Sequence, residues 1–269
     1  MKVAVTGGAG FIGSHLTTRL LRDGHEVKVI DNLSTGRRQN LAHLDGEVEI
    51  LEGDIADQEF LDRSLRGLEV VFHVAALPSV PRSWTDPLSS LRSNAYGTSV
   101  VGRAAVRNSV GTVVYSSSSS VYGDQPGDCR SEDMAPAPIS PYAYSKLLGE
   151  EVLLAHAAGG DLNAVALRYF NVFGPRQDPN SPYSAVIPLF ITAALRGEPV
   201  TIYGDGTQSR DFTYVDNVVE GNLLALAGRP TEGEAVFNIA CGVSITLLEL
   251  VAAISRIAGR EVEVRHGDP

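Results

Sequence analysis

The first thirteen residues constrain the fold more than any other stretch of this sequence. Val3–Thr6 is a short apolar run typical of a buried strand, and Gly7, Gly10 and Gly13 follow it directly. Glycines at this spacing let the chain turn tightly from a strand into a helix. They also let a pyrophosphate approach the backbone at the N-terminus of that helix. The pattern therefore predicts a βαβ domain that binds a dinucleotide.

Short apolar runs alternate with longer amphipathic segments through the first two-thirds of the chain. We expect strands at Val3–Thr6, Glu26–Asp31, Val48–Glu52, Val70–Val74, Thr112–Ser116 and Asn163–Arg168. We expect helices at Phe11–Asp23, Asp57–Leu65, Leu88–Asn108 and Pro141–His156. This alternation predicts an α/β fold, with a Rossmann-type, doubly wound parallel sheet in residues 1–168.

The composition changes after the last of these strands. Gly, Pro, Asn and Ser accumulate through Asn171–Tyr183, and a helix is expected at Ala185–Arg196. We interpret residues 169–269 as a smaller C-terminal substrate-binding lobe. A strand near Phe237–Ala240 is expected to return to the first domain.

The charge balance and the cysteines exclude several classes of protein. A formal net charge of −10 argues against general nucleic-acid binding, so an anionic ligand must be met by local arginines and helix N-termini. Cys129 and Cys241 show neither metal-ligand spacing nor a disulfide framework, and we expect reduced thiols and no metal. With no signal peptide and no membrane-length apolar run, we expect a cytoplasmic protein without a membrane partner.

The carboxylate at the end of the second predicted strand indicates which dinucleotide binds. Asp31 is placed to accept hydrogen bonds from the adenosine ribose and to repel a 2′-phosphate, which favours NAD over NADP. Arg37 and Arg38 keep NADP open, although solvated surface charges are the preferred interpretation. Asp54 and Ile55, after the third strand, are placed to meet adenine, with a helix N-cap as the alternative role of Asp54.

The fourth predicted strand ends in small residues. Ala75 and Ala76 close the segment His73-Val-Ala-Ala and would let the cofactor pass close to the backbone. His73 itself is interpreted as a packed histidine without a catalytic role.

Tyr142 and Lys146 lie four residues apart in a predicted helix and therefore face the same side. A nearby ammonium favours the phenolate and is expected to lower the tyrosine pKa from its usual value near 10. Tyr142 is thus a candidate general base. Together with a nicotinamide cofactor, it indicates hydride chemistry at a carbinol.

Further motifs extend along the chain. They are Thr6-Gly-Gly-Ala-Gly-Phe-Ile-Gly13, Asp31-Asn-Leu-Ser-Thr-Gly36, Ser118-Ser-Ser-Val-Tyr-Gly123, Tyr142-x-x-x-Lys146, Leu167-Arg-Tyr-Phe-Asn-Val-Phe-Gly-Pro175 and Ser209-Arg-Asp-Phe212. On these motifs the chain resembles the extended short-chain dehydrogenase/reductase family, and within it the NAD-dependent UDP-sugar 4-epimerases. The bacterial enzymes acting on UDP-glucose and UDP-N-acetylglucosamine are most similar, through the segments Pro81–Ser83, Arg176–Asn180 and Tyr183–Pro188.

The resemblance implies a role for each matching residue. The catalytic residues would be Ser118, Tyr142 and Lys146, with Lys146 also holding the nicotinamide ribose. The cofactor would contact Gly7, Gly10, Phe11, Ile12, Gly13, Asp31, Asn32, Ser34, Thr35, Gly36, Asp54, Ile55, Ala75, Ala76, Asn94, Tyr142, Lys146 and Phe170. The UDP-sugar would contact Ser79, Ser118, Asn171, Ala185, Val186, Tyr203 and Arg210. Arg82 is either a sugar or phosphate contact or part of a surface salt bridge.

The resemblance also narrows the reaction. Dehydratases of the family carry Thr-Asp-Glu where this chain has Ser118-Ser119-Ser120, and serine cannot replace their general acid. We therefore expect a 4-epimerase that interconverts UDP-glucose and UDP-galactose, their N-acetylated counterparts, or both, through a transient 4-keto sugar. The alternatives are UDP-glucuronate epimerisation, a 4-ketosugar reductase or dehydrogenase, and a non-catalytic NAD-binding scaffold.

Two expectations concern the whole molecule. A homodimer through the helices near Leu88–Asn108 and Pro141–His156 is usual in the family, but either face could equally be covered within one chain. Members of the family continue beyond a segment like Arg265–Pro269, so the substrate lobe is expected to be shortened at its C-terminus.

Overall fold

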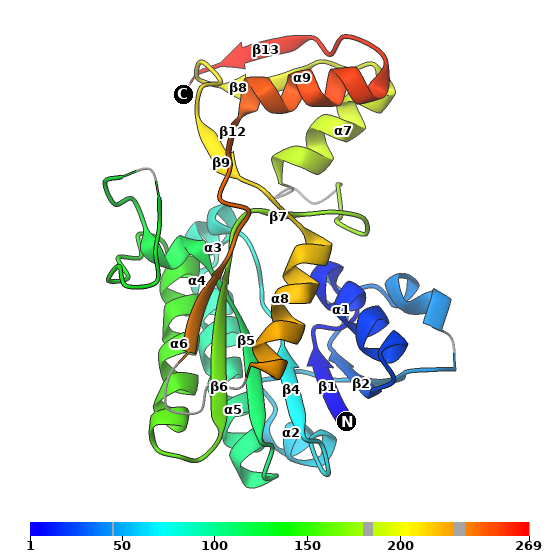
Figure 1. The fold of residues 1–269 in the computed structure, drawn as a ribbon, viewed down its shortest axis with the longest axis vertical. Helices are drawn as coiled ribbons and strands as arrows, with labels where there is room; N and C mark the ends of the chain where they lie inside the picture. Colours follow the sequence, from blue (N-terminus) through cyan, green and yellow to red (C-terminus); the bar gives the residue numbers. More distant parts are fainter. Residues whose placement is uncertain (45, 128, 180–184, 229–234, 269) are drawn as a thin grey trace. The chain divides into compact units, whose positions relative to one another are not determined.

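The computed structural model describes residues 1–44, 46–127, 129–179, 185–228 and 235–268. The chain divides into two compact units (Figure 1). Unit 1 comprises Met1–Tyr169 and Asp216–Ile239, and unit 2 comprises Phe170–Val215 and Ala240–Pro269. None of the helices in the described ranges has both the length and the apolar character needed to cross a bilayer.

Unit 1 is built on a seven-stranded, wholly parallel sheet with the strand order β11-β6-β5-β4-β1-β2-β3. The strands are β1 (Lys2–Thr6), β2 (Glu26–Asp31), β3 (Glu49–Glu52), β4 (Val70–His73), β5 (Thr112–Ser118), β6 (Asn163–Tyr169) and β11 (Ala235–Ile239). The first six strands begin and end within two residues of the predicted apolar runs. The runs mark these strands because a strand covered by helices on both faces consists mainly of apolar residues. The predicted Rossmann-type α/β fold is confirmed.

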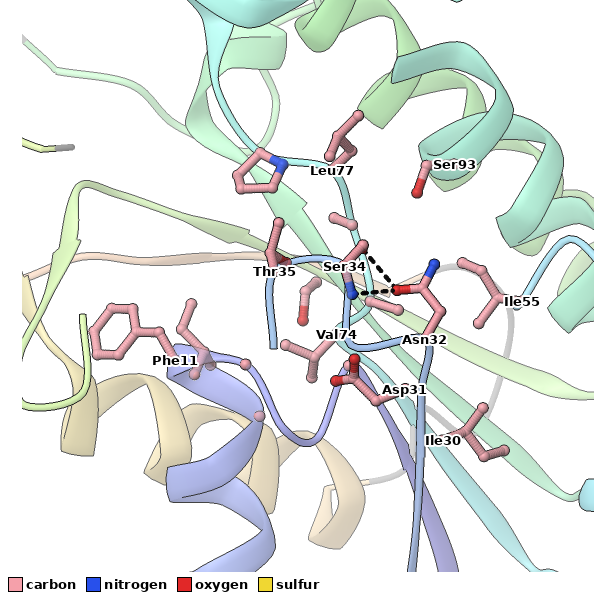
Figure 2. Close-up of a pocket in the computed structure, with 18 of the residues that line it drawn as sticks. Phe11, Ile30, Asp31, Asn32, Ser34, Thr35, Ile55, Val74, Leu77 and Ser93 are labelled. Carbon is pink, nitrogen blue, oxygen red and sulfur yellow. Dashed lines mark hydrogen bonds between the residues drawn. The ribbon is translucent and has the colours of Figure 1, made fainter. Parts of the chain in front are cut away.

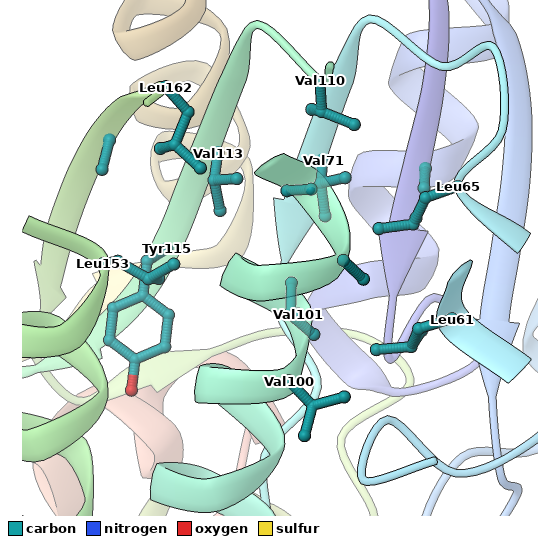
Figure 3. Packing of buried hydrophobic residues seen from close by; sticks show 14 of the residues in the cluster. Leu61, Leu65, Val71, Val100, Val101, Val110, Val113, Tyr115, Leu153 and Leu162 are labelled. Atoms are coloured by element: carbon teal, nitrogen blue, oxygen red, sulfur yellow. The ribbon is translucent and has the colours of Figure 1, made fainter. Parts of the chain in front are cut away.

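Helices cover both faces of this sheet. On one face α2 (Gln58–Ser64), α5 (Gly97–Arg107) and α6 (Pro141–Ala158) pack on the strands through the cluster in Figure 3, which includes Leu61, Val101 and Leu153. On the other face, α1 (Phe11–Arg22) and the 3₁₀ helix η1 (Arg38–Leu44) enclose a smaller cluster around Val29 and Leu41. Helix α8 (Val215–Ala227) contributes Asn222, whose Nδ2 donates to the Tyr169 hydroxyl at 2.8 Å.

One predicted helix, Leu88–Asn108, consists of three consecutive pieces. They are α4 (Pro87–Leu91), the π-helical turn η2 (Arg92–Tyr96) and α5, and the short α3 (Val80–Thr85) precedes them. Asn94 lies in the π turn with no exposed surface, and its side chain bonds both the N–H and the C=O of Leu77. The backbone carbonyl of Asn94 accepts from the Thr98 hydroxyl at 2.6 Å. These contacts are non-local or depend on the turn itself, so the sequence pattern could not locate the widened turn.

Helix α6 begins where its capping residues place it. The Ser140 hydroxyl accepts the Ala143 N–H at 3.2 Å, and Pro141 occupies the first turn, where a missing N–H costs little. Tyr142 therefore lies in the first turn and Lys146 in the second, close to the carboxyl end of β5. The 3₁₀ turn η3 (Ser119–Tyr122) follows β5 directly.

Unit 2 is smaller, and its described residues form three two-stranded sheets. The parallel pairs are β7 (Val172–Phe173) with β10 (Thr213–Tyr214) and β8 (Val200–Tyr203) with β13 (Val264–Gly267). The antiparallel pair is β9 (Ser209–Asp211) with β12 (Ser244–Thr246). Helices α7 (Val186–Arg196) and α9 (Leu247–Ala258) enclose its apolar core, and α9 begins with a capping box between Thr246 and Glu249.

Candidate active site

A cavity of about 240 Å³ lies at the carboxyl ends of the unit 1 strands (Figure 2). Such crevices are where open parallel sheets bind their ligands. The predicted residues that line it are Gly7, Gly10, Phe11, Ile12, Gly13, Asp31, Asn32, Ser34, Thr35, Ile55, Ala75, Ala76, Tyr142 and Lys146. The structure thus brings the glycine turn and the Tyr–Lys pair to the same cavity.

The glycine turn leaves no room for side chains. Gly7 has a φ of +69°, and a Cβ there would lie 2.7 Å from the Ala75 backbone. At Gly13 a Cβ would lie 2.1 Å from the Gly7 carbonyl oxygen. Helix α1 begins after Gly10 with no side chain capping its first turn, so backbone N–H groups remain available to a ligand. This arrangement fits the pyrophosphate of a dinucleotide.

Asp31 is held rigidly at the end of β2. One carboxylate oxygen accepts the Ala9 N–H at 2.9 Å, and the other accepts the Leu33 N–H at 2.8 Å. Burial raises the pKa of Asp31, while these two backbone bonds oppose the rise. A Cβ at Gly36 would meet the same carboxylate at 2.8 Å, so the absence of a side chain there leaves space for Asp31.

Next to Asp31, Asn32 accepts the Ser34 N–H and hydroxyl through its Oδ1, drawn as dashed lines in Figure 2. Of the two arginines that kept NADP open, Arg38 forms an ion pair of 2.7 Å with Glu52 at the surface.

Four predicted cofactor contacts do not line this cavity. Asp54 instead accepts from Arg92 at 2.7 Å and from the Ala56 N–H. It is not the N-cap of α2 either, because Asp57 fills that position. The Asn94 side chain forms hydrogen bonds with Leu77 and Ser145 and does not line the cavity.

The other two predicted contacts that do not line the cavity are Gly36 and Phe170. Gly36 lies next to the Asp31 carboxylate, and Phe170 belongs to unit 2.

The three predicted catalytic residues come from α6 and from the end of β5. Tyr142 is half-buried, Lys146 is 2 % exposed, and both line the cavity. The Ser118 hydroxyl interacts with the Tyr142 phenol and also accepts from Ser120 at 2.9 Å. The Lys146 Nζ lies 4.4 Å from the centroid of the Tyr115 ring, a cation–π geometry.

The pKa of Tyr142 differs in direction from the prediction. Burial raises it above its usual value, and only the Ser118 hydrogen bond opposes the rise. Burial also lowers the pKa of Lys146 to about 7, although the Glu150 charge works against this. Lys146 is therefore partly neutral near pH 7 in the chain alone. A lysine that is only partly protonated cannot supply the full positive charge on which the predicted lowering of the Tyr142 pKa depends.

Sequence reasoning missed a buried polar cluster behind these residues. The Glu150 carboxylate accepts from the Ser117 hydroxyl at 2.7 Å and from two nitrogens of Arg168, Nη2 at 2.5 Å and Nε at 3.2 Å. Two signals could have revealed it. Glu150 follows Lys146 by one helical turn, and Arg168 interrupts an otherwise apolar strand.

On the α8 side of the sheet, the Ser116 and Tyr169 hydroxyls lie 2.9 Å apart.

Unit 2 contains a second cavity, of about 300 Å³. Four predicted substrate residues line it, namely Asn171, Ala185, Val186 and Arg210. Tyr203, at 67 % exposure, is not among its lining residues. Ser79 lies in unit 1, where its hydroxyl caps α3 by accepting the Arg82 N–H at 3.1 Å.

Comparisons with known proteins agree with this site. The model of the NAD-dependent epimerase/dehydratase family matches residues 3–240. UDP-glucose 4-epimerase of Mycolicibacterium smegmatis is 41% identical over 278 residues, which cover 100% of this chain and 86% of that protein.

Two solved structures are similar throughout. UDP-N-acetylglucosamine 4-epimerase from Methanobrevibacter ruminantium, in complex with UDP-N-acetylmuramic acid, superposes with a TM-score of 0.94 and 42% identity over 99% of this chain and 85% of that one. MoeE5 in complex with UDP-glucuronic acid and NAD gives a TM-score of 0.89 and 41% identity over 100% and 86%. The resemblance to the extended short-chain dehydrogenase/reductases is confirmed, and so is NAD as the cofactor. From its sequence, its fold and its cofactor cavity, the chain belongs to the NAD-dependent epimerase/dehydratase family.

Proposed function

We propose that this chain is a UDP-sugar 4-epimerase acting on UDP-hexoses, UDP-glucose and UDP-galactose or their N-acetylated counterparts. The observation that carries the proposal is the placement of Tyr142 and Lys146 on the same cavity as the glycine turn, with Ser118 in contact with the phenol. An acid–base group beside the nicotinamide end of a dinucleotide site suits oxidation of a secondary alcohol. UDP-sugar relatives supply the substrate class.

The residues divide the work as follows. Tyr142 removes the proton of the sugar 4-hydroxyl and later returns it, while Ser118 orients that hydroxyl. NAD, when bound, takes up the hydride of C4 and gives it back. Gly7, Gly10 and Gly13 would hold its pyrophosphate. The 4-keto sugar turns between the two half-reactions, so the protein has to hold the nucleotide firmly and the sugar loosely.

The nucleotide end has suitable groups in unit 2. Asn171 and Arg210 line the second cavity, and a guanidinium can bind two phosphate oxygens at once. Ala185 and Val186 supply an apolar wall there for uracil.

The side chains of Ser119 and Ser120 argue against a dehydratase reaction. The 4,6-dehydratases use carboxylic acids at those positions to expel a hydroxyl, and a serine hydroxyl is too weak an acid for that step.

The test is incubation with UDP-glucose, UDP-N-acetylglucosamine and UDP-glucuronate separately, followed by chromatography of the sugar nucleotides. We expect inversion at C4 of the first or second without added cofactor. The variant Tyr142→Phe should lose about 10²–10⁴-fold in kcat and still bind UDP. The matched control is Tyr144→Phe on the same helix, because Tyr144 does not line the cavity and the substitution keeps its ring, so turnover should stay native.

Other outcomes would replace the proposal. Turnover of UDP-glucuronate alone would assign the chain to that substrate, which MoeE5 binds. A requirement for stoichiometric NADH would indicate a 4-ketosugar reductase or dehydrogenase, and no turnover of any UDP-sugar would indicate a scaffold. Near-native turnover by Tyr142→Phe would refute the assignment of the base.

We also propose a homodimer through α4, η2 and α6. These helices expose large apolar side chains, Leu88, Tyr96, Tyr144 and Leu148, at 48–76 % of their surface. Sedimentation equilibrium tests for this dimer.

A cytoplasmic location stays a prediction.

A further inference from the structure

Three residues of α6 share one face of the helix and run into the protein interior. Tyr142, Lys146 and Glu150 are spaced by four, so each lies about 6 Å further along the helix axis than the one before. Lys146 is 2 % exposed and Glu150 is 1 % exposed. A catalytic lysine is thus followed, one turn deeper, by a fully buried carboxylate.

The Glu150 carboxylate is fixed by groups from two neighbouring strands. Ser117 of β5 and Arg168 of β6 are directly opposite each other in the sheet register, and both donate to it. This rung is adjacent to Ser118, which pairs with Tyr169. The carboxylate therefore connects the catalytic helix to the strand that ends in the catalytic serine.

Glu150 supplies one negative charge to an interior that contains two buried cations. Lys146 and Arg168 are both buried, and Glu150 bonds Arg168 while its charge acts on Lys146 from one helical turn away. Tyr115 lies 4.4 Å from the ammonium, and Tyr122 lies 4.7 Å from the guanidinium. A guanidinium stays charged at any accessible pH, whereas a buried ammonium can release its proton. If the carboxylate loses its charge, Lys146 is the group that responds.

We propose that Glu150 is a positioning residue of the catalytic pair, whose carboxylate, anchored by Ser117 and Arg168, increases the protonated fraction of the Lys146 side chain on which Tyr142 depends. The inference rests on the proposed function for its catalytic meaning. A charged Lys146 beside Tyr142 favours release of the phenol proton, since a nearby opposite charge stabilises the phenolate. Glu150 acts through Lys146 and does not line the cavity itself.

Several other ionisable groups face this cluster, and their charge states have to be considered. They are Tyr142 from α6, Tyr115 from β5, His73 from β4, Arg168 from β6 and Tyr122 from η3. Burial lowers the pKa of His73 to about 3, with the Lys146 charge as a second cause, so His73 is neutral in the working range. Burial raises the pKa of Tyr115, so its phenol stays protonated. Glu150 is then the negative charge to which Lys146 responds.

The sequence makes a direct measurement practical, because it contains only three lysines: Lys2, Lys28 and Lys146. Protein labelled with [ε-¹³C]lysine should give three ε-carbon signals, which can be followed against pH by NMR. Lys2 and Lys28 form surface ion pairs with Glu26 and Glu49 and serve as internal references. We expect the Lys146 signal to titrate near pH 7, well below the ordinary lysine value of 10.5.

Glu150→Gln keeps the shape of the side chain and removes its charge. We expect the Lys146 midpoint to fall by about one to two further pH units, as a neighbouring opposite charge is typically worth. The alkaline limb of the kcat–pH profile should move in the same direction. Glu151→Gln, the next residue on the helix, removes an exposed charge and should leave both measurements unchanged. Glu150→Asp keeps the charge and should restore the wild-type midpoint.

A folded Glu150→Gln protein with the wild-type Lys146 midpoint would overturn the inference and leave Glu150 a structural clamp. If that variant does not fold, Glu150→Gln/Arg168→Met removes the unpaired guanidinium as well. The reference is then Arg168→Met alone, from which the double variant differs only by the Glu150 charge. The Lys146 midpoint should be lower in the double variant than in that reference, and equal midpoints would refute the inference. The NMR titration needs no turnover, so it decides this inference even where the proposed reaction fails.

Discussion

Gly13→Ala tests the cofactor site where the backbone is tightest. A Cβ at this position would lie 2.1 Å from the Gly7 carbonyl oxygen and 2.8 Å from the Gly8 Cα. Both contacts are with backbone, so no change of side-chain rotamer relieves them. The turn has to open by roughly 1 Å to reach a tolerable separation. Opening it displaces the N–H groups at the start of α1 that would bind pyrophosphate.

The expected magnitudes follow from this geometry. Overpacking of this kind costs about 1–3 kcal/mol, and each kcal/mol lowers Tm by about 2–4 °C in a domain of this size. We expect NAD affinity to fall by about 100-fold or more, since the binding groups themselves move. At an NAD concentration of about 100 times the wild-type Kd, wild type gains about 2.7 kcal/mol and the variant only about 0.4 kcal/mol.

The assay is differential scanning calorimetry of cofactor-free protein with and without NAD, together with calorimetric titration of NAD. Gly111→Ala is the matched control, because a Cβ there would make only an ordinary 3.6 Å contact with the Glu69 carbonyl. We expect Gly111→Ala to keep the full NAD-dependent rise in Tm. Wild-type NAD affinity and Tm in Gly13→Ala would show that the turn is not the pyrophosphate site.

Three further predictions concern the same unit. Gly149→Ala should cost about 1–3 kcal/mol in chemical denaturation, because its Cβ would lie 2.5 Å from the Tyr115 hydroxyl. Asp31→Ser should weaken NAD binding at least about tenfold and reduce the preference for NAD over NADP. The substitution removes two hydrogen bonds to the backbone and the charge that repels a 2′-phosphate. Competitive binding of NAD and NADP measures both effects. The pKa of His73 is about 3 in the folded state and 6.5 in the unfolded state, so the unfolded chain binds more protons between these two pH values. The stability of the protein should therefore fall as the pH falls from 6.5 to about 3. In thermal unfolding, His73→Gln should reduce this dependence of stability on pH.

Local spacing determined much of this protein. The strands of the Rossmann-type sheet, the glycine turn and the Asp31 position follow from short-range patterns of apolar residues, glycines and one carboxylate. The Tyr142–Lys146 pair follows from helical periodicity. These features depend on neighbours within a few residues, so the sequence states them directly.

Tertiary structure decided what those residues do. Glu150 meets Ser117 across 33 residues of sequence and Arg168 across 18, which no local pattern encodes. The π turn holds the Asn94 side chain against Leu77, and Asn94 does not line the cavity. The pKa of Tyr142 moves upward because the fold buries the phenol, and burial is a property of everything packed around a group.

The sequence alone set the α/β dinucleotide-binding fold and the candidate residues. The distances, burial and charge states that govern their chemistry arose only when distant segments packed together.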